Sequence, residues 1–445
     1  MEFRVFLSKL KESGNLVQID QECSINLEIA RKIKEHDGKP VFFPRVKESN
    51  IPVVSGLFGF RGAFYLATSG TADEGFSKDD LFRKETEPAT NPSSFIYRLY
   101  KAINGRETPL ISDSPAMCQE VVEKPDFLQE LPILKHLDGD GGRYITSGVV
   151  IYKCPKYGRN VSFHRMMIID DDKLVARVVE NRGLDTALRE TGGPVEAAIV
   201  IGSSPEIMVS ASTSAPKGVD ELSIANALNP FKVTKCKTID VHVPSQSEIV
   251  IEGKFLPDDL VEEGPFMDLT GTLDIVRKQP TFEVSAVTHR KNPYYHALLP
   301  AGKEHEFLMG LPREATMLME LLPYDYVRDV RLTPGSSHWF NSVVQVDHAK
   351  PIAPKDVITS CFKGHSSLKN CLIVDDDVNI GDPHDLEFAI TTRAQFSKDL
   401  YLFPGERGSS LDPSANQVTR ETCKVGIDAT MSRGKEQSKY LKQEY

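Results

Sequence analysis

The segment from 160 to 183 constrains the fold of this chain most, because it combines strand-forming residues with an unusual density of polar groups. Its sequence is NVSFHRMMIIDDDKLVARVVENRG. Apolar and β-branched residues on both sides of an acidic triplet predict two antiparallel strands joined by a polar turn. In that hairpin Asn160, Ser162 and His164 would share one face, and Arg165 would begin the other unless a bulge redirects it. The polar face either lines a site or meets water at an exposed sheet edge.

Composition narrows the class of protein. A chain of 445 residues with 40% hydrophobic residues is long enough for two or three domains with real cores. The net charge is −10, from 53 basic and 63 acidic residues, which argues against nucleic acid or an anionic membrane as the main partner. No apolar run is long enough to cross a bilayer, and the first residues become charged too early for a secretory signal. We therefore expect a cytoplasmic protein.

The 7 cysteines do not predict a disulfide framework or a zinc site. They are scattered along the chain, their number is odd, and none forms a C-x-x-C pair. In a cytoplasmic protein such cysteines are reduced and behave mostly as small buried hydrophobic residues.

Alternation of helical and strand patterns predicts an α/β protein of several domains. The N-terminal part begins with an amphipathic helix that ends near Gly14, and the middle of the chain is richer in strands. The expected helices are 3–13, 27–35, 221–228, 315–322 and 383–393. The expected strands are 17–19, 40–43, 147–152, 197–201, 281–288, 294–299, 342–346 and 370–374, and 51–59 is a further apolar run punctuated by glycine. The strands 281–288 and 294–299 are expected to form a hairpin, and the tail 432–445 is a helix or a frayed end.

Two polar turns allow both a structural and a functional interpretation. A strand followed by Gly202-Ser203-Ser204-Pro205 could hold a phosphate on backbone N–H groups, although most such turns only reverse the chain. The acidic run Asp375-Asp376-Asp377 after a strand could bind a divalent metal or could cap the next helix.

The motif Glu263-Gly264-Pro265-Phe266-Met267-Asp268 places two carboxylates on either side of a Gly-Pro turn. In a partly dry pocket such a pair splits its proton affinities, so that one acid is ionised while the other can donate a proton. A nearby arginine would keep one acid ionised and bind an anionic substrate. The same motif also occurs as an ordinary surface turn.

Several motifs together resemble the UbiD family of decarboxylases, which use prenylated FMN. These are NVSFHR at 160–165, ARVV at 176–179, RG at 182–183, SEIVIEG at 247–253, EGPFMDLTG at 263–271, YYH at 294–296, VDDDVN at 374–379, AITTR at 389–393 and GIDAT at 426–430. The motifs follow one another along most of the chain and are specific to the family.

The resemblance implies a catalytic and cofactor site. Arg165, Glu263 and Asp268 match the family's catalytic arginine and two acids. The residues that match segments lining the prenylated flavin are Phe163, His164, Arg165, Arg177, Val178, Val179, Arg182 and Gly183.

The resemblance also implies a metal site. Asn160 and Glu221 match metal ligands, which together with the cofactor phosphate would hold Mn²⁺, commonly with K⁺ beside it. Some members have a histidine as a further ligand on the returning strand, where this chain has Glu180-Asn181, so a third protein ligand stays open.

The implied reaction is the non-oxidative decarboxylation of an α,β-unsaturated acid. The chain resembles the compact archaeal type, which converts trans-anhydromevalonate 5-phosphate to isopentenyl phosphate and CO₂ in a mevalonate pathway. By position, Lys303, His305 and Arg313 are candidates for binding the substrate phosphate, or are surface charges. An aromatic acid such as a polyprenyl-4-hydroxybenzoate is the alternative substrate, and a non-catalytic scaffold that binds flavin and metal is the alternative of another class.

The resemblance further implies three domains and two kinds of partner. We expect an N-terminal α/β module at 1–115, a central flavin-binding split β-barrel domain at 116–310, and a C-terminal α/β domain for oligomerisation at 311–445. A separate flavin prenyltransferase would supply the cofactor, and the protein would form a homo-oligomer.

Overall fold

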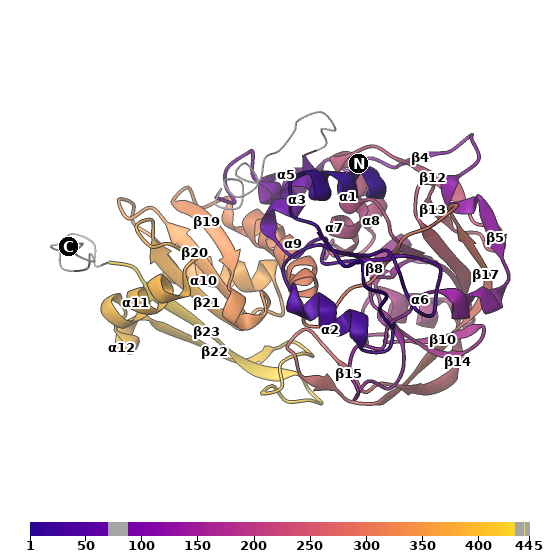
Figure 1. Cartoon of the computed structure of the whole chain (residues 1–445). Coiled ribbons are helices and arrows are strands. Elements are labelled where there is room, and N and C mark those ends of the chain that lie inside the picture. Colours follow the sequence, from indigo (N-terminus) through magenta and orange to yellow (C-terminus); the bar gives the residue numbers. More distant parts are fainter. Residues whose placement is uncertain (70–87, 432–439, 441–445) are drawn as a thin grey trace. The chain divides into compact units, whose positions relative to one another are not determined.

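The computed structural model describes residues 1–69, 88–431 and 440 of the chain (Figure 1). These residues belong to two compact units, the first made of 1–82 and 102–308 and the second of 83–101 and 309–445. The expected C-terminal helix or frayed end therefore lies outside the described residues, apart from Tyr440. The division into three domains at 115 and 310 stays a prediction.

An antiparallel sheet of nine strands forms the centre of the first unit. Eight strands follow the order β6-β9-β10-β17-β14-β11-β7-β8, and β5 pairs with β17. Their bounds are β5 (Val121–Glu123), β6 (Tyr144–Ile145), β7 (Val149–Cys154), β8 (Gly158–Phe163), β9 (Met166–Asp170), β10 (Lys173–Ala176), β11 (Val195–Ile201), β14 (Ile249–Glu263) and β17 (Arg277–His289). β6 and β8 are the edges of this order, so the sheet is open, as a split barrel is, and is not a closed barrel.

Aliphatic and aromatic side chains of β11, β14 and β17 supply much of the core of this unit. Ile199, Ile251, Phe255 and Phe282 are fully buried, and the rings of Phe255 and Phe282 meet at 4.9 Å between centroids. Near-continuous apolar runs are typical of strands covered on both faces, which explains why β11 and the first half of β14 contain few polar residues. This rigid core supports the polar ends of the same strands.

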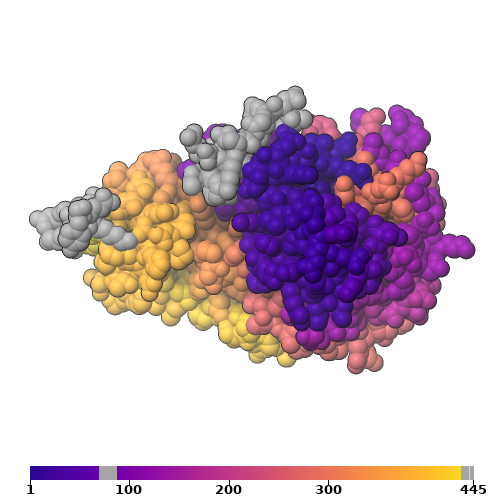
Figure 2. Space-filling view, viewed as in Figure 1, coloured from indigo at the N-terminus to yellow at the C-terminus, as the bar shows by residue number. Residues whose placement is uncertain are grey.

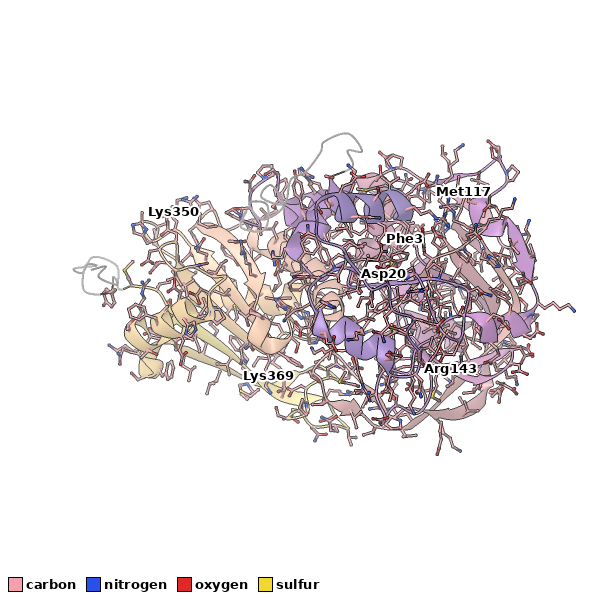
Figure 3. All side chains as sticks on the ribbon, viewed as in Figure 1. Phe3, Asp20, Met117, Arg143, Lys350 and Lys369 are labelled. Atoms are coloured by element: carbon pink, nitrogen blue, oxygen red, sulfur yellow. The ribbon has the colours of Figure 1, made fainter. Side chains whose placement is uncertain are left out.

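The N-terminal elements cover one face of the first unit, as the indigo surface in Figure 2 shows. They are α1 (Phe3–Glu12), β1 (Val17–Gln18), α2 (Glu28–Glu35), β2 (Val41–Phe43), β3 (Val53–Ser55) and α3 (Arg61–Thr68). The order of their sheet is β1-β2-β3-β18, where β18 is Tyr295–His296. Phe3 on α1, labelled in Figure 3, is buried and lies 6.1 Å from the His296 ring.

The remaining elements of the first unit are short. The helices are α6 (Gly183–Thr191), α7 (Pro205–Ala211) and α8 (Glu221–Leu228), with 3₁₀ turns at Met117–Gln119 and Pro125–Glu130. The strands are β4 (Leu110–Ile111), β12 (Lys232–Lys235), β13 (His242–Pro244), β15 (Phe266–Met267) and β16 (Leu273–Asp274). α5 (Phe95–Asn104) and α9 (Lys303–Leu321) each run across a boundary between the two units.

The second unit contains a five-stranded sheet in the order β19-β20-β21-β23-β22. Its strands are β19 (Val327–Leu332), β20 (Asn341–Val346), β21 (Asn370–Asp375), β22 (Leu400–Arg407) and β23 (Glu421–Ala429), and its helices include α10 (Pro354–Gly364), α11 (Pro383–Arg393) and α12 (Phe396–Asp399). A 3₁₀ turn lies at Pro334–Ser336. Lys369, labelled in Figure 3, donates to Asp412 at 2.8 Å just before β21 begins.

The predicted α/β class is confirmed, and two local predictions are wrong. β17 pairs with β14, β10 and β5, whereas β18 pairs in parallel with β3, so 281–288 and 294–299 are not a hairpin. The strand expected to begin at Asn160 is also interrupted, because β8 ends at Phe163 and β9 begins at Met166. The predicted turn joins β9 and β10, and β8 pairs instead with β7.

None of the described helices has the length and the apolar character needed to cross a membrane. The cytoplasmic location stays a prediction.

Candidate active site

The connection between the two longest strands carries the acidic residues of the site. β14 and β17 pair from end to end except at bulges, the larger of them at 257–259, and Glu263 at the end of β14 lies opposite Arg277 at the start of β17. Between them a small hairpin pairs Phe266 with Asp274 across the loop that begins at Asp268. Gly264 has a φ of 102°, a backbone conformation that favours glycine, and the Gly264–Pro265 peptide bond is cis. The strand pairing thus brings three carboxylates of one connection close together.

Arg165 lies at the centre of these carboxylates. Its Nε and Nη2 donate to the two oxygens of Glu263 at 2.9 and 3.0 Å, the two-point geometry that suits a guanidinium and a carboxylate. Nη1 donates to Asp268 at 2.8 Å, and Nη2 also donates to Asp274 at 2.9 Å. The Phe266 ring lies 4.9 Å from the guanidinium carbon and shields it from water.

Burial decides how strongly these charges act on one another. The Glu263 side chain is fully buried and the Arg165 side chain is 9% exposed. Burial alone would lower the pKa of Arg165, but its hydrogen bonds with Glu263 and the charges of all three acids outweigh burial and raise that pKa. Burial likewise raises the pKa of Asp274, but the hydrogen bond from Arg277 and the charge of Arg165 hold it below its ordinary value. Arg165 is therefore a permanent cation, and Asp274 is an ionised partner.

The interruption between β8 and β9 is what aims Arg165 at these acids. His164 leaves the ladder and its ring bonds to the Arg177 carbonyl at 3.0 Å and to the Ser162 hydroxyl at 3.0 Å. The backbone N–H of Arg177 donates to the Arg165 carbonyl at 3.1 Å. Burial lowers the pKa of His164, so the ring is neutral near pH 7. The local hydrogen bonds replace the lost strand pairing and fix the direction of Arg165.

The residues predicted to line a flavin lie on adjoining segments. Segment 163–165 follows β8, segment 177–179 follows β10, and the two are joined by the hydrogen bonds of His164 and Arg177. The Val178 N–H donates to Gln279 at 2.6 Å, and the Arg182 N–H donates to the Val179 carbonyl at 3.2 Å. Arg182 then caps the N-terminus of α6, which begins with Gly183. The structure thus connects all eight predicted cofactor residues in one part of the first unit.

Asn160 and Glu221, the two predicted metal ligands, are direct neighbours. The Asn160 amide nitrogen lies 3.2 and 3.4 Å from the two Glu221 oxygens, and the Val161 N–H donates to Glu221 at 2.8 Å. Tyr152 donates to the Asn160 oxygen. A Cβ on Gly183 would lie 2.5 Å from that oxygen and from the Tyr152 hydroxyl, so a larger residue there would displace these two side chains. The start of α6, which favours anions, therefore approaches this pair closely.

The donor set of this pair fits a hard cation. Burial raises the pKa of Glu221 to about 8, so without a nearby positive charge this carboxyl holds a proton. A divalent cation would take the place of that proton, and a half-turn of the Asn160 amide would present its oxygen beside the carboxylate. The structure adds no metal ligand from Glu180-Asn181, the two residues that stand where some family members have a histidine. Glu180 is exposed, and the Asn181 oxygen accepts a hydrogen bond from Arg189 at 3.4 Å.

The three residues suggested for a substrate phosphate all lie on α9 and differ in their surroundings. Lys303 pairs with Glu306 at 2.8 Å, and Arg313 belongs to the second unit, where its guanidinium carbon lies 5.3 Å from the Trp339 ring centre. Burial lowers the pKa of His305, against the charges of Asp268 and Glu306, so His305 is a neutral hydrogen-bonding group. Its Nδ1 accepts the Ala301 N–H at 3.1 Å.

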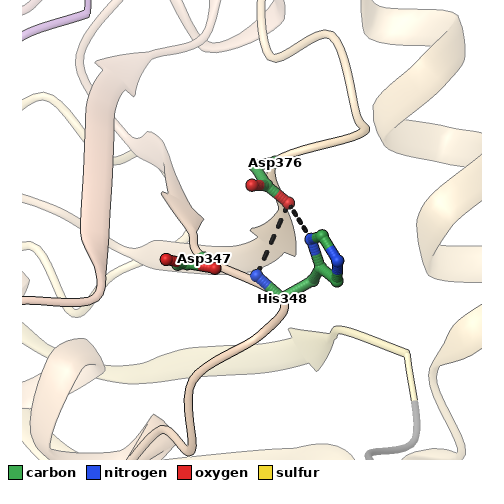
Figure 4. Close-up of side chains that lie close together, drawn as sticks. All are labelled: Asp347, His348 and Asp376. Carbon is green, nitrogen blue, oxygen red and sulfur yellow. Dashed lines mark hydrogen bonds and ion pairs between the residues drawn. The ribbon is translucent and has the colours of Figure 1, made fainter.

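The acidic run at the end of β21 bonds to protein groups and does not cap the next helix, α11, whose N-cap is Asp382. Both oxygens of Asp377 accept from Arg393 at 2.8 and 2.7 Å, and Asp375 accepts the Met431 N–H at 2.6 Å. Asp376 bonds to the His348 ring at 2.7 Å beside Asp347, as Figure 4 shows. Asp347 in turn pairs with Arg328. Asp347, His348 and Asp376 lie close enough together to hold a metal ion, so the metal interpretation of the acidic run stays a prediction.

Sequence reasoning missed four residues of the site: Tyr144, His136, Asp274 and Arg277. The Tyr144 hydroxyl bonds to Glu263 at 3.3 Å and accepts the Gly264 N–H at 3.1 Å. The buried His136 ring meets the Phe266 ring edge-on at 6.2 Å, and burial lowers its pKa to about 3. The sequence signal for the last two was the turn Thr270-Gly271-Thr272 between Leu269 and Leu273, which is typical of a hairpin.

Comparison with known families and structures gives consistent matches over the chain. Residues 110–303 match the model of the 3-octaprenyl-4-hydroxybenzoate carboxy-lyase Rift-related domain, 306–429 match the C-terminal domain of that carboxy-lyase, and 7–78 match its N-terminal domain. An anhydromevalonate phosphate decarboxylase of Methanosarcina mazei is 38% identical over 436 residues, which cover 97% of this chain and 96% of that protein.

Two solved structures of one enzyme are also similar. The UbiD-class enzyme HmfF from Pelotomaculum thermopropionicum in complex with FMN has a TM-score of 0.89 and 33% identity, covering 100% of this chain and 97% of that one. An evolved dimeric form of the same enzyme in complex with prFMN, or prenylated FMN, has a TM-score of 0.85 and 34% identity, with 98% and 96% covered.

Proposed function

This chain belongs to the UbiD family and is a carboxy-lyase, and we propose that it decarboxylates trans-anhydromevalonate 5-phosphate to isopentenyl phosphate and CO₂. The observation that carries the proposal is the buried Arg165 held by Glu263 and Asp268 at the end of β14. The archaeal relative named for this substrate, similar over nearly its whole length, supports the choice of acid.

Loss of CO₂ from an unsaturated carbon leaves an electron pair that a cofactor must accept, and prenylated FMN supplies this capacity when bound. Phe163 to Arg165, Arg177 to Val179 and Arg182-Gly183 would hold it, with its phosphate near the start of α6. Asn160 and Glu221 would hold Mn²⁺, with K⁺ beside it. The burial of Glu221, which raises its pKa, and the close approach of Gly183 to the Asn160 oxygen support this arrangement.

Arg165 would bind the substrate carboxylate and orient it for departure. Glu263 would fix the orientation of the guanidinium, since its fully buried carboxylate accepts hydrogen bonds from both Nε and Nη2. Asp268 would return a proton to the carbon that has lost CO₂, alone or as a pair with Glu263, so that one C–C bond breaks and one C–H bond forms. The Asp268 side chain is 22% exposed, which leaves it accessible to substrate.

Two partners belong to this proposal. A flavin prenyltransferase would supply the modified cofactor. The protein would also assemble as a homo-oligomer, as the dimeric form of the similar HmfF illustrates for that enzyme.

A second substrate class is favoured by a specific finding, because the matching family models are named for a carboxy-lyase of 3-octaprenyl-4-hydroxybenzoate. A non-catalytic scaffold is disfavoured by the site itself, since a binder of flavin and metal has no need of an acid beside a buried arginine.

The test is a substrate comparison with protein co-produced with a flavin prenyltransferase. The cofactor is first identified by its mass and absorbance spectrum, and CO₂ release is then measured with trans-anhydromevalonate 5-phosphate and with 4-hydroxybenzoates. Release from the phosphorylated acid alone supports the proposal. Release from the aromatic acids alone would replace the substrate, and absence of any bound flavin would contradict the proposed cofactor.

A further inference from the structure

Arg165 has few hydrogen-bond donors left for a substrate. A guanidinium carries five N–H donors, and in the described part of the chain four of them reach carboxylates: Nε and one Nη2 hydrogen go to Glu263, one Nη1 hydrogen to Asp268, and the other Nη2 hydrogen to Asp274. One Nη1 hydrogen remains, on the nitrogen that also holds Asp268.

Asp274 determines which nitrogen of Arg165 keeps a free N–H donor. Without it, Nη2 would have a hydrogen free for an anion, on the part of the guanidinium that Asp268 does not contact. With it, Nη2 is saturated, and an incoming carboxylate meets only Nη1. We infer that Asp274 is a positioning residue that directs the substrate carboxylate to the side of Arg165 that Asp268 also contacts.

The surroundings of Asp274 fit this task. Its Oδ1 accepts the Ile275 N–H at 2.9 Å and Arg277 at 2.6 Å, and its Oδ2 lies 3.7 Å from Arg177 Nε and 2.9 Å from Arg165. Every oxygen is therefore occupied by donors, so the carboxylate cannot rotate without losing a charged bond. Its strand position opposite Phe266 places it beside the ring that covers Arg165.

Charge balance gives the inference a second consequence. Three arginines, 165, 177 and 277, face three acids, 263, 268 and 274, and the groups around them include Tyr144, His305 and Glu306. Neutralising Asp274 leaves an excess positive charge near the two remaining acids. Anions then bind more tightly, and the acid that gives a proton in the proposed reaction would release it at lower pH.

The inference rests on the proposed function. Its test is designed so that a wrong role for Asp274 and a wrong proposed function give different results. Asp274→Asn keeps the shape but turns an N–H donor toward one of the arginines, and Asp274→Glu restores the charge. Asp259→Asn is the matched control, because Asp259 is a surface acid of β14 that pairs with Lys173 at 3.4 Å. All are made as flavin-loaded proteins, and rates are expressed per bound cofactor with whichever acid the wild type turns over.

For Asp274→Asn we expect kcat to fall about ten- to hundredfold, the range for a lost charge-assisted hydrogen bond. KM should not rise, and the alkaline limb of the pH profile should move to lower pH. Asp274→Glu should recover part of kcat and the pH limb, and Asp259→Asn should behave as wild type. A variant with wild-type kcat per cofactor and an unmoved limb would overturn the inference.

A binding measurement decides the inference even if no acid is turned over. Calorimetry with a saturated analogue of the proposed substrate, which has the carboxylate but not the double bond, should give a lower Kd for Asp274→Asn than for wild type. Equal or weaker binding would count against Asp274 as the group that limits access to Nη2. Absence of turnover by the wild type would instead count against the proposed function.

Discussion

The Glu263→Gln substitution should slow decarboxylation strongly while leaving the fold and the cofactor in place. Glutamine has the same size, but only one of its two end groups can accept a hydrogen bond from Arg165. Its amide nitrogen would face the second guanidinium N–H, which lies at 2.9 or 3.0 Å from the present carboxylate oxygens. Arg165 would then lose both a charged bond and its fixed direction.

The magnitude follows from these two losses. A hydrogen bond to a charged group contributes about 1.5–3 kcal/mol, and leaving a buried donor unsatisfied costs about 1–3 kcal/mol. Because Asp268 and Asp274 still hold Arg165, the lower ends apply, and together they give about 2.5 kcal/mol, or roughly 70-fold in rate.

The assay is CO₂ release per bound cofactor, with thermal unfolding as a check on the fold. Glu283→Gln serves as the control, because Glu283 lies on β17 and pairs with Lys254 at 2.9 Å on the exposed face of the sheet. Glu263→Gln at full cofactor occupancy with a rate within about threefold of wild type would refute the role of Glu263 in holding Arg165.

Three further perturbations test other parts of the site. Asp268→Asn should bind the cofactor normally and lose turnover, and full activity of the loaded variant would remove Asp268 from the reaction. Gly183→Ala would place a Cβ 2.5 Å from the Asn160 oxygen, so Mn²⁺ affinity measured by calorimetry should fall about 10–100-fold, and wild-type affinity would contradict the proposed metal site. The buried His136 has a pKa of about 3, against 6.5 ordinarily, so the unfolded chain binds more protons between these values and stability falls as pH drops through this window. His136→Gln should remove up to about 1.4 kcal/mol per pH unit of that dependence in urea unfolding, and an unchanged slope would show that His136 does not cause it.

Sequence patterns located several elements of this fold because helix and strand periods are local. The expected strand 197–201 is part of β11 and the expected helix 383–393 is α11, because continuous apolar runs and helical spacing do not depend on distant residues. Strand partners are not local, which is why the hairpin expected for 281–288 and 294–299 was wrong.

The candidate site shows the same difference between local features, which the sequence predicts, and contacts between distant residues, which it does not. Family resemblance picked out Arg165, Glu263 and Asp268, and the structure brings them together. Asp274 was not predicted because its importance depends on two contacts that are not local. One is its pairing with Phe266 in a hairpin whose strands have two residues each, and the other is its bond to an arginine 109 positions earlier in the chain. The interruption of the strand at His164 also depends on a distant residue. The His164 ring bonds to the Arg177 carbonyl, and this hydrogen bond explains why the strand stops there.

The most direct test of the central proposal is to run the reaction of the flavin-loaded protein with trans-anhydromevalonate 5-phosphate in D₂O and to analyse the product by NMR. The proposal predicts CO₂ together with isopentenyl phosphate that carries one deuterium on the carbon that held the carboxylate, because an acid of the site supplies the incoming proton. A loaded enzyme that forms no isopentenyl phosphate, or forms it without deuterium at that carbon, would contradict it.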